Sequence, residues 1–175
     1  MTETPQEYTA RILGLAAGHD HLKVQAATPT KLGRLLKGQT ARALTRPPAP
    51  GRWSVRQIVA HLADAEVVVS YRMRTILSRN GTEIQAFDQN EWAADGRYDQ
   101  ADIEEALAAF VALRRLNLRL LKRLAPAERA RYGMHQERGK ESLDRIATMV
   151  AGHDLNHLGQ IEGILRRSGG SGHKP

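Results

Sequence analysis

Apolar residues recur at intervals of three and four along most of the chain, which is the period of a helix that packs on one side. The alternation of apolar and polar residues that is typical of strands never persists over a useful length. The pattern predicts four main helices, at about residues 5–36, 55–80, 101–124 and 143–167. Helices of this length with short connections pack well as an antiparallel four-helix bundle, so the expected fold class is all-α.

Local signals mark breaks and ends of these helices. The first helix should be interrupted by Gly14, Gly18 and Pro29. Thr28 is placed to cap a restart at Pro29, because proline is favoured in the first turn of a helix. Ser54 is followed three residues later by Gln57, which is the sequence of a capping box at the start of the second helix.

The connections between the helices are polar or rich in proline. Residues 46–53, RPPAPGRW, contain three prolines and a glycine and should form an ordered crossing loop. Residues 82–99 form a long connection with one helical turn, and Asp99 or a neighbour should cap the third helix. A polar loop at 126–141 leads to Ser142, which can cap the fourth helix.

No internal repeat or change in composition marks a domain boundary, so residues 1–167 should form one domain, followed by a flexible tail at 168–175. The absence of cysteine excludes disulfides, thiolate zinc fingers and thiol nucleophiles. No apolar run is long enough to span a bilayer, and the first residues are acidic where a signal peptide is basic. We therefore expect a cytoplasmic protein that does not enter a membrane.

The chain is basic, with 26 Lys and Arg against 19 Asp and Glu and a formal net charge of +7. Such a balance can attract nucleic acid or anionic substrates. The arginines are scattered, however, and aromatic residues, which would stack on bases, make up only 5% of the chain. A solvated basic surface is the better interpretation, and a nucleic-acid partner is not expected.

The strongest chemical signal is a set of three histidines. His153 and His157 are four residues apart on the fourth predicted helix, so their rings project from one face and can bind one ion such as Zn²⁺, Ni²⁺ or Fe²⁺. His61 lies on the apolar stripe of the second helix, where a buried imidazole needs a metal or a hydrogen-bond partner. Three histidines leave coordination positions open, as in catalytic sites. The alternative is a set of core histidines that only pack or bind a carboxylate.

Other residues could assist this site. Asp64, one turn after His61, and Gln160, three residues after His157, could each orient a ligand or be an ordinary polar residue. Arg72 could attract an anionic cosubstrate or form an interhelical ion pair. Asp154 follows His153 but does not complete the metalloprotease sequence HExxH, so no catalytic base is assigned. The remaining histidines receive no ligand role: His19, His21, His135 and His173.

Five segments, in this order, resemble the DinB superfamily, also called DinB/YfiT-like metalloenzymes. They are PGRWSVRQIVAHLADAE at 50–66, YRMRTIL at 71–77, FDQNEWA at 87–93, GMHQERGKESL at 133–143 and AGHDLNHLGQI at 151–161. They cover the chain from about residue 45 to 167.

The resemblance implies a four-helix bundle with up-down-down-up connections, usually a homodimer. It also implies a three-histidine metal centre, and its ligand positions match His61, His153 and His157, with zinc or nickel as the ion. Some relatives look like transferases that use low-molecular-weight thiols. We therefore expect a metal-dependent enzyme, a thiol transferase or a hydrolase, that acts on a small molecule. The alternatives are a non-catalytic metal-binding protein and a structural or DNA-associated stress protein.

Overall fold

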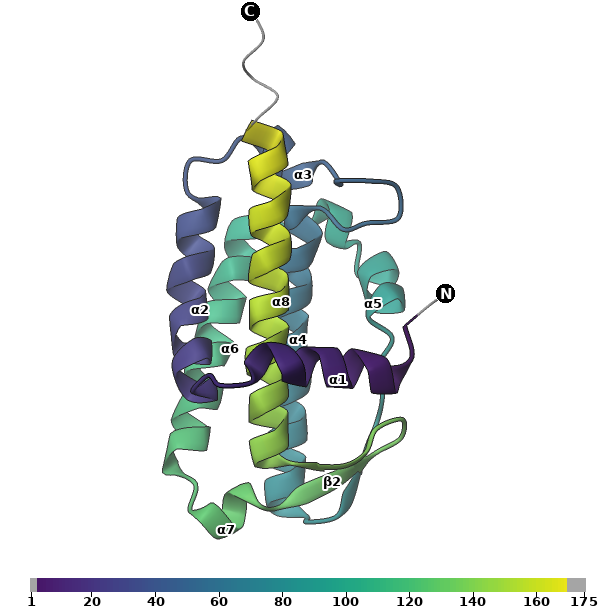
Figure 1. Cartoon of the computed structure of the whole chain (residues 1–175), viewed down its shortest axis with the longest axis vertical. Helices are drawn as coiled ribbons and strands as arrows, with labels where there is room; N and C mark the ends of the chain where they lie inside the picture. Colours follow the sequence, from purple (N-terminus) through teal and green to yellow (C-terminus); the bar gives the residue numbers. More distant parts are fainter. Residues whose placement is uncertain (1–2, 170–175) are drawn as a thin grey trace, which may run out of the picture.

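Four long helices form the body of the protein in the computed structural model, which describes residues 3–169. They are α2 (His21–Leu36), α4 (Val55–Ser78), α6 (Ile103–Arg123) and α8 (Leu143–Gly169). Figure 1 shows that α2 and α8 run in one direction while α4 and α6 run in the other, and that α1 (Pro5–Ala16) lies across α8. The predicted helical bundle is therefore confirmed, with up-down-down-up connections.

The first predicted helix is in fact two helices, and only one of its predicted breaks exists. The chain turns between α1 and α2 at Gly18, which has a φ of 76° that glycine adopts without a steric penalty. Asp20 then caps α2 by accepting a hydrogen bond from the Lys23 amide at 3.0 Å. The break at Gly18 was predicted correctly.

The predicted restart at Pro29 is wrong, because Pro29 lies inside α2. Thr28 does not cap a helix; its hydroxyl donates to the carbonyl of Val24 at 3.0 Å. A proline has no N–H, so the carbonyl four residues earlier, that of Gln25, lacks its helical donor. Arg114 of α6 donates to this carbonyl at 3.2 Å and so replaces the missing bond.

The other predicted caps are mostly confirmed. Ser54 and Gln57 form the capping box of α4. Ser142 accepts from the Arg145 amide at 3.1 Å at the start of α8. The cap of α6 is Asp102, whereas Asp99 lies in the short 3-10 helix Tyr98–Gln100. Helix α8 continues to Gly169, two residues beyond the predicted end, and residues 170–175 of the predicted tail lie outside the described residues.

The connections contain short elements that the sequence pattern did not reveal. Three strands, β1 (Thr82–Ile84), β2 (Tyr132–His135) and β3 (Gly139–Ser142), form a small sheet in which β1 is parallel and β3 antiparallel to β2. Strands of three or four residues are too short to display alternation. The short helices are α3 (Ala41–Thr45), α5 (Gln89–Asp95) and α7 (Pro126–Arg129), of which only α5 was expected.

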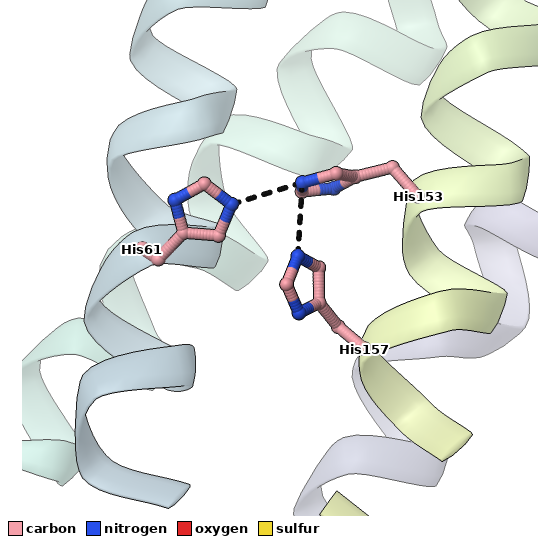
Figure 2. A group of neighbouring side chains, drawn as sticks. All are labelled: His61, His153 and His157. Atoms are coloured by element: carbon pink, nitrogen blue, oxygen red, sulfur yellow. Dashed lines mark hydrogen bonds between the residues drawn. The ribbon is translucent and has the colours of Figure 1, made fainter. Parts of the chain in front are cut away.

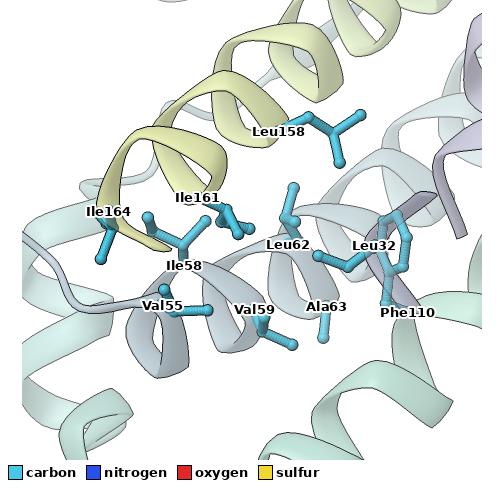
Figure 3. Packing of buried hydrophobic residues seen from close by; sticks show 10 residues of the cluster. All are labelled: Leu32, Val55, Ile58, Val59, Leu62, Ala63, Phe110, Leu158, Ile161 and Ile164. Carbon is cyan, nitrogen blue, oxygen red and sulfur yellow. The ribbon is translucent and has the colours of Figure 1, made fainter. Parts of the chain in front are cut away.

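The main hydrophobic core fills the bundle where α4 faces α8 and α6. Figure 3 shows side chains from these helices and from α2 that interlock there. Its fully or nearly fully buried members are Leu32, Val55, Ile58, Val59, Leu62, Ala63, Phe110, Leu158, Ile161 and Ile164. A second cluster around Met73, Ile76 and Leu143 fills the end of the bundle next to the sheet. No described helix has the length and apolar character needed to cross a bilayer.

Helix α1 contacts α8 closely because Gly152 lacks a side chain. A Cβ at this position would overlap the backbone carbonyl of Ile12. At Gly159, on the same helix, a Cβ would meet no atom within 4 Å. The two glycines therefore offer a matched pair for testing this contact.

We expect Gly152→Ala to lower the free energy of unfolding by about 3 kcal/mol, because the added methyl group must push α1 away from α8. Gly159→Ala should instead raise it by about 0.5–1 kcal/mol, since alanine favours a helix. Urea denaturation of both variants gives these values. Equal and small effects in the two variants would show that α1 does not pack on α8 as described.

Candidate metal centre

Three imidazole rings converge between α4 and α8. His61 projects from α4, His153 and His157 project from α8, and their Nε2 atoms point toward one another (Figure 2). The Nε2 atom of His153 lies 2.9 Å from that of His61 and 3.1 Å from that of His157. Nitrogen atoms at about 2.0–2.1 Å from a tetrahedral ion are about 3.3 Å apart, so the rings need only a small displacement to share one.

The three rings are neutral at neutral pH. Burial lowers the pKa of His61 and of His153 well below the usual histidine value, and the neighbouring histidines lower each pKa further. Burial also lowers the pKa of His157, to about 4. Neutral imidazole is the form of histidine that binds a metal ion, because its unprotonated nitrogen carries a lone pair.

Gln160 fixes the orientation of the His157 ring. Its Oε1 atom accepts a hydrogen bond from Nδ1 of His157 at 2.9 Å. The lone pair of His157 is then on Nε2, which faces the other two rings. Nε2 of His153 lies near the Nε2 atoms of both His61 and His157, and a proton on it can be donated to only one of them. At least one nitrogen lone pair in the group therefore has no hydrogen-bond donor from the protein. The donor set therefore suits a divalent ion.

The nitrogen-only donor set also limits which ion fits. Mg²⁺ and Ca²⁺ prefer oxygen ligands, whereas imidazole suits zinc, nickel, copper and iron. The group formed by His61, His153 and His157 is the set of potential metal-binding side chains found within residues 3–169. Two of the candidate ligands lie one helical turn apart and the third on the facing helix, so a bound ion would keep coordination positions for other molecules.

Aromatic side chains cover the His61 side of the group. The Trp53 ring, at the end of the proline-rich loop, lies with its centroid 4.9 Å from that of His61. Tyr98 packs against Trp53 and donates a hydrogen bond to Asp64 at 2.6 Å. Asp64 thus binds Tyr98 rather than a histidine, while Nδ1 of His61 is buried without a hydrogen-bond partner among the described residues.

A buried ionic network lies directly behind the histidines, and it was not predicted from the sequence. Arg114 of α6 donates to both carboxylate oxygens of Asp154, at 2.5 and 2.8 Å, and to Glu66 at 2.9 Å. Asn117 donates to the second oxygen of Glu66 at 2.9 Å. With its bond to the carbonyl of Gln25, Arg114 connects α6 to the three other long helices.

Arg114 remains charged in this position. Burial lowers its pKa, but the carboxylates of Asp154 and Glu66 outweigh this effect and raise the pKa above the usual arginine value. Asp154 directly follows His153, and Glu66 lies five residues after His61. The network therefore fixes the register between α4 and α8 that brings the histidines together. One sequence signal could have revealed it, because Arg114 falls on the apolar stripe of α6 with Phe110, Leu118 and Leu121.

A cavity of about 740 Å³ opens beside the histidines, with His61 and His153 in its wall. Arg72, the candidate from the sequence, also lines it, at the end near the sheet. His135 lies in β2 and contacts Arg72 rather than the other histidines. His19 is exposed and His21 half-buried at the start of α2, so neither joins the group. His173 lies outside the described residues.

Comparisons with known proteins agree with this geometry. A protein of Oceanobacillus iheyensis named as a candidate metal-dependent hydrolase is 31% identical over 117 residues, which cover 67% of each chain. The similarly named YfiT protein of Bacillus subtilis is 28% identical over 86% of this chain and 85% of its own. The solved structure of YfiT, described as having an unusual four-helix bundle topology, matches with a TM-score of 0.80 and 26% identity, covering 85% of this chain and 86% of that one.

The family comparison covers most of the chain. The model of the DinB superfamily matches residues 26–161, a range that includes the three histidines, Arg72 and the Arg114 network. Together with the fold and the converging imidazoles, this match shows that the chain belongs to the DinB superfamily.

Proposed function

We propose that the protein is a metal-dependent hydrolase of a small molecule, with His61, His153 and His157 as the ligands of a divalent transition metal. The observation that carries this proposal is the convergence of three neutral imidazole nitrogens, two of which belong to residues in the wall of a large cavity, His61 and His153. The names of the relatives in Oceanobacillus iheyensis and Bacillus subtilis support the same reaction class.

Each part of the chain has a defined task in this proposal. A bound divalent ion supplies Lewis acidity, which activates water near neutral pH and polarises the bond to be cleaved. The histidines provide three positions of the coordination shell and leave the cavity side open to water and substrate. Gln160 holds the His157 ring in the required tautomer, and Trp53 keeps bulk water from the back of His61.

Hydrolysis is favoured over thiol transfer by the names of the relatives. A low-molecular-weight thiol would use the same open coordination position, since a metal also lowers the pKa of a thiol. We propose zinc or nickel as the ion because the ligands are all imidazoles. We further propose that the bundle is one domain over residues 1–167, and that the protein acts as a homodimer in the cytoplasm.

The hydrolase proposal is tested with chromogenic carboxylic esters, anilides and phosphodiesters. The metal-free protein, the zinc-loaded and nickel-loaded proteins, and a His153→Ala variant are assayed side by side. His19→Ala is the matched control, since His19 is exposed and does not belong to the group. We expect at least one substrate class to be cleaved only by the metal-loaded wild type and His19→Ala. Equal rates for the loaded wild type and His153→Ala with every substrate would contradict the proposal.

Gln160→Leu should weaken zinc binding by about 10- to 100-fold, because the His157 ring loses the hydrogen bond that orients it. Competition with a chromophoric chelator measures this change. Glu162→Leu, an exposed replacement on the same helix, should leave the affinity unchanged. Unaltered zinc affinity in Gln160→Leu would show that the hydrogen bond does not prepare the ligand.

A further inference from the structure

Arg72 is a cation that lines the cavity on the same face of α4 as His61. Arg72 lies on α4 eleven residues after His61, and eleven residues are three helical turns with an offset of only about 20°. The two side chains therefore occupy the same stripe of α4, about 16 Å apart along the helix axis. Both line the same cavity.

Among the described residues, hydrogen bonds reach only the Nη2 atom of the Arg72 guanidinium. Its Nη2 atom donates to the carbonyl of Gln85 at 2.6 Å and lies 3.3 Å from Nε2 of His135. The guanidinium also lies over the ring of Phe87, 5.7 Å from the centroid. These contacts fix its position on the wall of the cavity. Within residues 3–169, no side chain forms a hydrogen bond with its Nε or Nη1 atom.

The charges around Arg72 do not neutralise it. Arg138 faces it, but this arginine is bound through Nε and Nη2 to the two oxygens of Glu141, at 2.7 and 3.0 Å. Glu137 is exposed and makes no ion pair with Arg72 among the described residues. Burial and the positive charge of Arg138 lower the pKa of Arg72 to about 10, while the negative charges of Glu141 and Glu137 raise it by less, so Arg72 remains charged at neutral pH.

The wall between the two ends of the stripe is mostly apolar, and the charged residues Glu66 and Arg114 that also line the cavity are paired with each other. Its apolar residues are Ala65, Val68 and Val69 of α4 and Ile146, Met149 and Val150 of α8. The cavity thus combines imidazole nitrogens at one end, an apolar middle, and an arginine fork at the other end.

Resting on the hydrolase proposal above, we propose that Arg72 is the carboxylate-binding subsite of this cavity. The substrate then carries a carboxylate at one end, an apolar chain in the middle and the bond to be cleaved at the end next to the histidines. The Nε and Nη1 donors of an arginine match the two oxygens of a carboxylate. A phosphate monoester carries about two negative charges, and Arg72 is a single unpaired cation, so the site favours the monoanion.

The test uses a pair of probes of equal length. Suberic acid monohydroxamate carries a metal-binding hydroxamate at one end and a carboxylate at the other, while octanohydroxamate ends in a methyl group. Isothermal calorimetry compares both on the zinc-loaded wild type, Arg72→Met, Arg72→Lys and Arg52→Met. Arg52, an exposed arginine that also lines the cavity, provides the matched loss of charge.

We expect the wild type and Arg52→Met to prefer the carboxylate probe by about 10- to 100-fold, the range of one charge-assisted hydrogen-bonded pair. Arg72→Met should abolish the preference and bind octanohydroxamate as the wild type does, and Arg72→Lys should retain a smaller preference. Equal binding of the two probes by the wild type would overturn the assignment. A preference that survives in Arg72→Met, or is lost in Arg52→Met, would overturn it as well.

A second arm separates this proposal from the metal site. Acetohydroxamate, which has neither chain nor carboxylate, reports the metal alone. If it fails to bind, the metal proposal fails, and octanoate binding to the metal-free protein then decides the subsite. We expect Arg72→Met to weaken octanoate binding by at least 10-fold and Arg52→Met to leave it unchanged. Octanoate binding that is equal in the wild type and Arg72→Met would refute the subsite, as would tighter binding of octyl phosphate than of octanoate.

Discussion

Replacing Arg114 by methionine should lower the free energy of unfolding by about 3–5 kcal/mol, because Asp154 and Glu66 would lose their common cationic partner inside the bundle. Both carboxylates are almost completely buried, with exposed fractions of 0% and 2%. The carbonyl of Gln25, which has no helical donor because of Pro29, would also lose its hydrogen bond. Guanidinium chloride denaturation of the metal-free protein measures the loss.

Arg115→Met is the matched control, since Arg115 is the next residue on α6 and is exposed. We expect it to change the stability by less than about 0.5 kcal/mol. Apolar replacement of Arg114, Asp154 and Glu66 together should recover much of the loss, because no buried charge then remains in this network. A loss below about 1 kcal/mol in Arg114→Met would mean that the network does not hold the four helices together.

His153→Ala should reduce zinc affinity by about 10²–10³-fold, if the roughly 10–16 kcal/mol of a four-ligand structural zinc site is shared equally among its ligands. His153 has the largest expected effect because both short nitrogen–nitrogen distances involve its Nε2 atom. Added zinc should stabilise the wild type by about 4 kcal/mol at a thousandfold excess over its dissociation constant. The same zinc concentration should stabilise His153→Ala far less.

Thermal unfolding with and without zinc measures this difference, and His19→Ala serves as the control because His19 is exposed and does not belong to the group. The control should gain as much stability from zinc as the wild type does. Equal zinc-dependent gains in wild type and His153→Ala would place the bound ion elsewhere on the protein.

The features that could be predicted from the sequence are those encoded in local periodicity. The stripe of α4, the capping box at Ser54 and the spacing of His153 and His157 each depend on neighbours within a few turns, and all three were predicted correctly. The convergence of His61 with the pair on α8 required the two helices to face each other, which their shared apolar faces already indicated.

The features that escaped prediction depend on contacts between distant segments. Pro29 looked like a helix start because proline is favoured in the first turn of a helix. It is tolerated inside α2 because Arg114, 85 residues later in the chain, replaces the missing helical hydrogen bond. The strand β1 exists because it pairs with β2, and neither is long enough to show its own pattern. Asp154 could be assigned no role from sequence, since its partner Arg114 lies 40 residues away.

The most direct test of the account is the metal content of the untagged protein, purified without chelators and measured by elemental mass spectrometry. We predict about one zinc or nickel ion per chain, retained after gel filtration and absent from the His153→Ala/His157→Ala variant. A wild-type protein that contains no transition metal and fails to take up either added zinc or added nickel would contradict the metal centre and leave the three histidines as packing residues of the bundle.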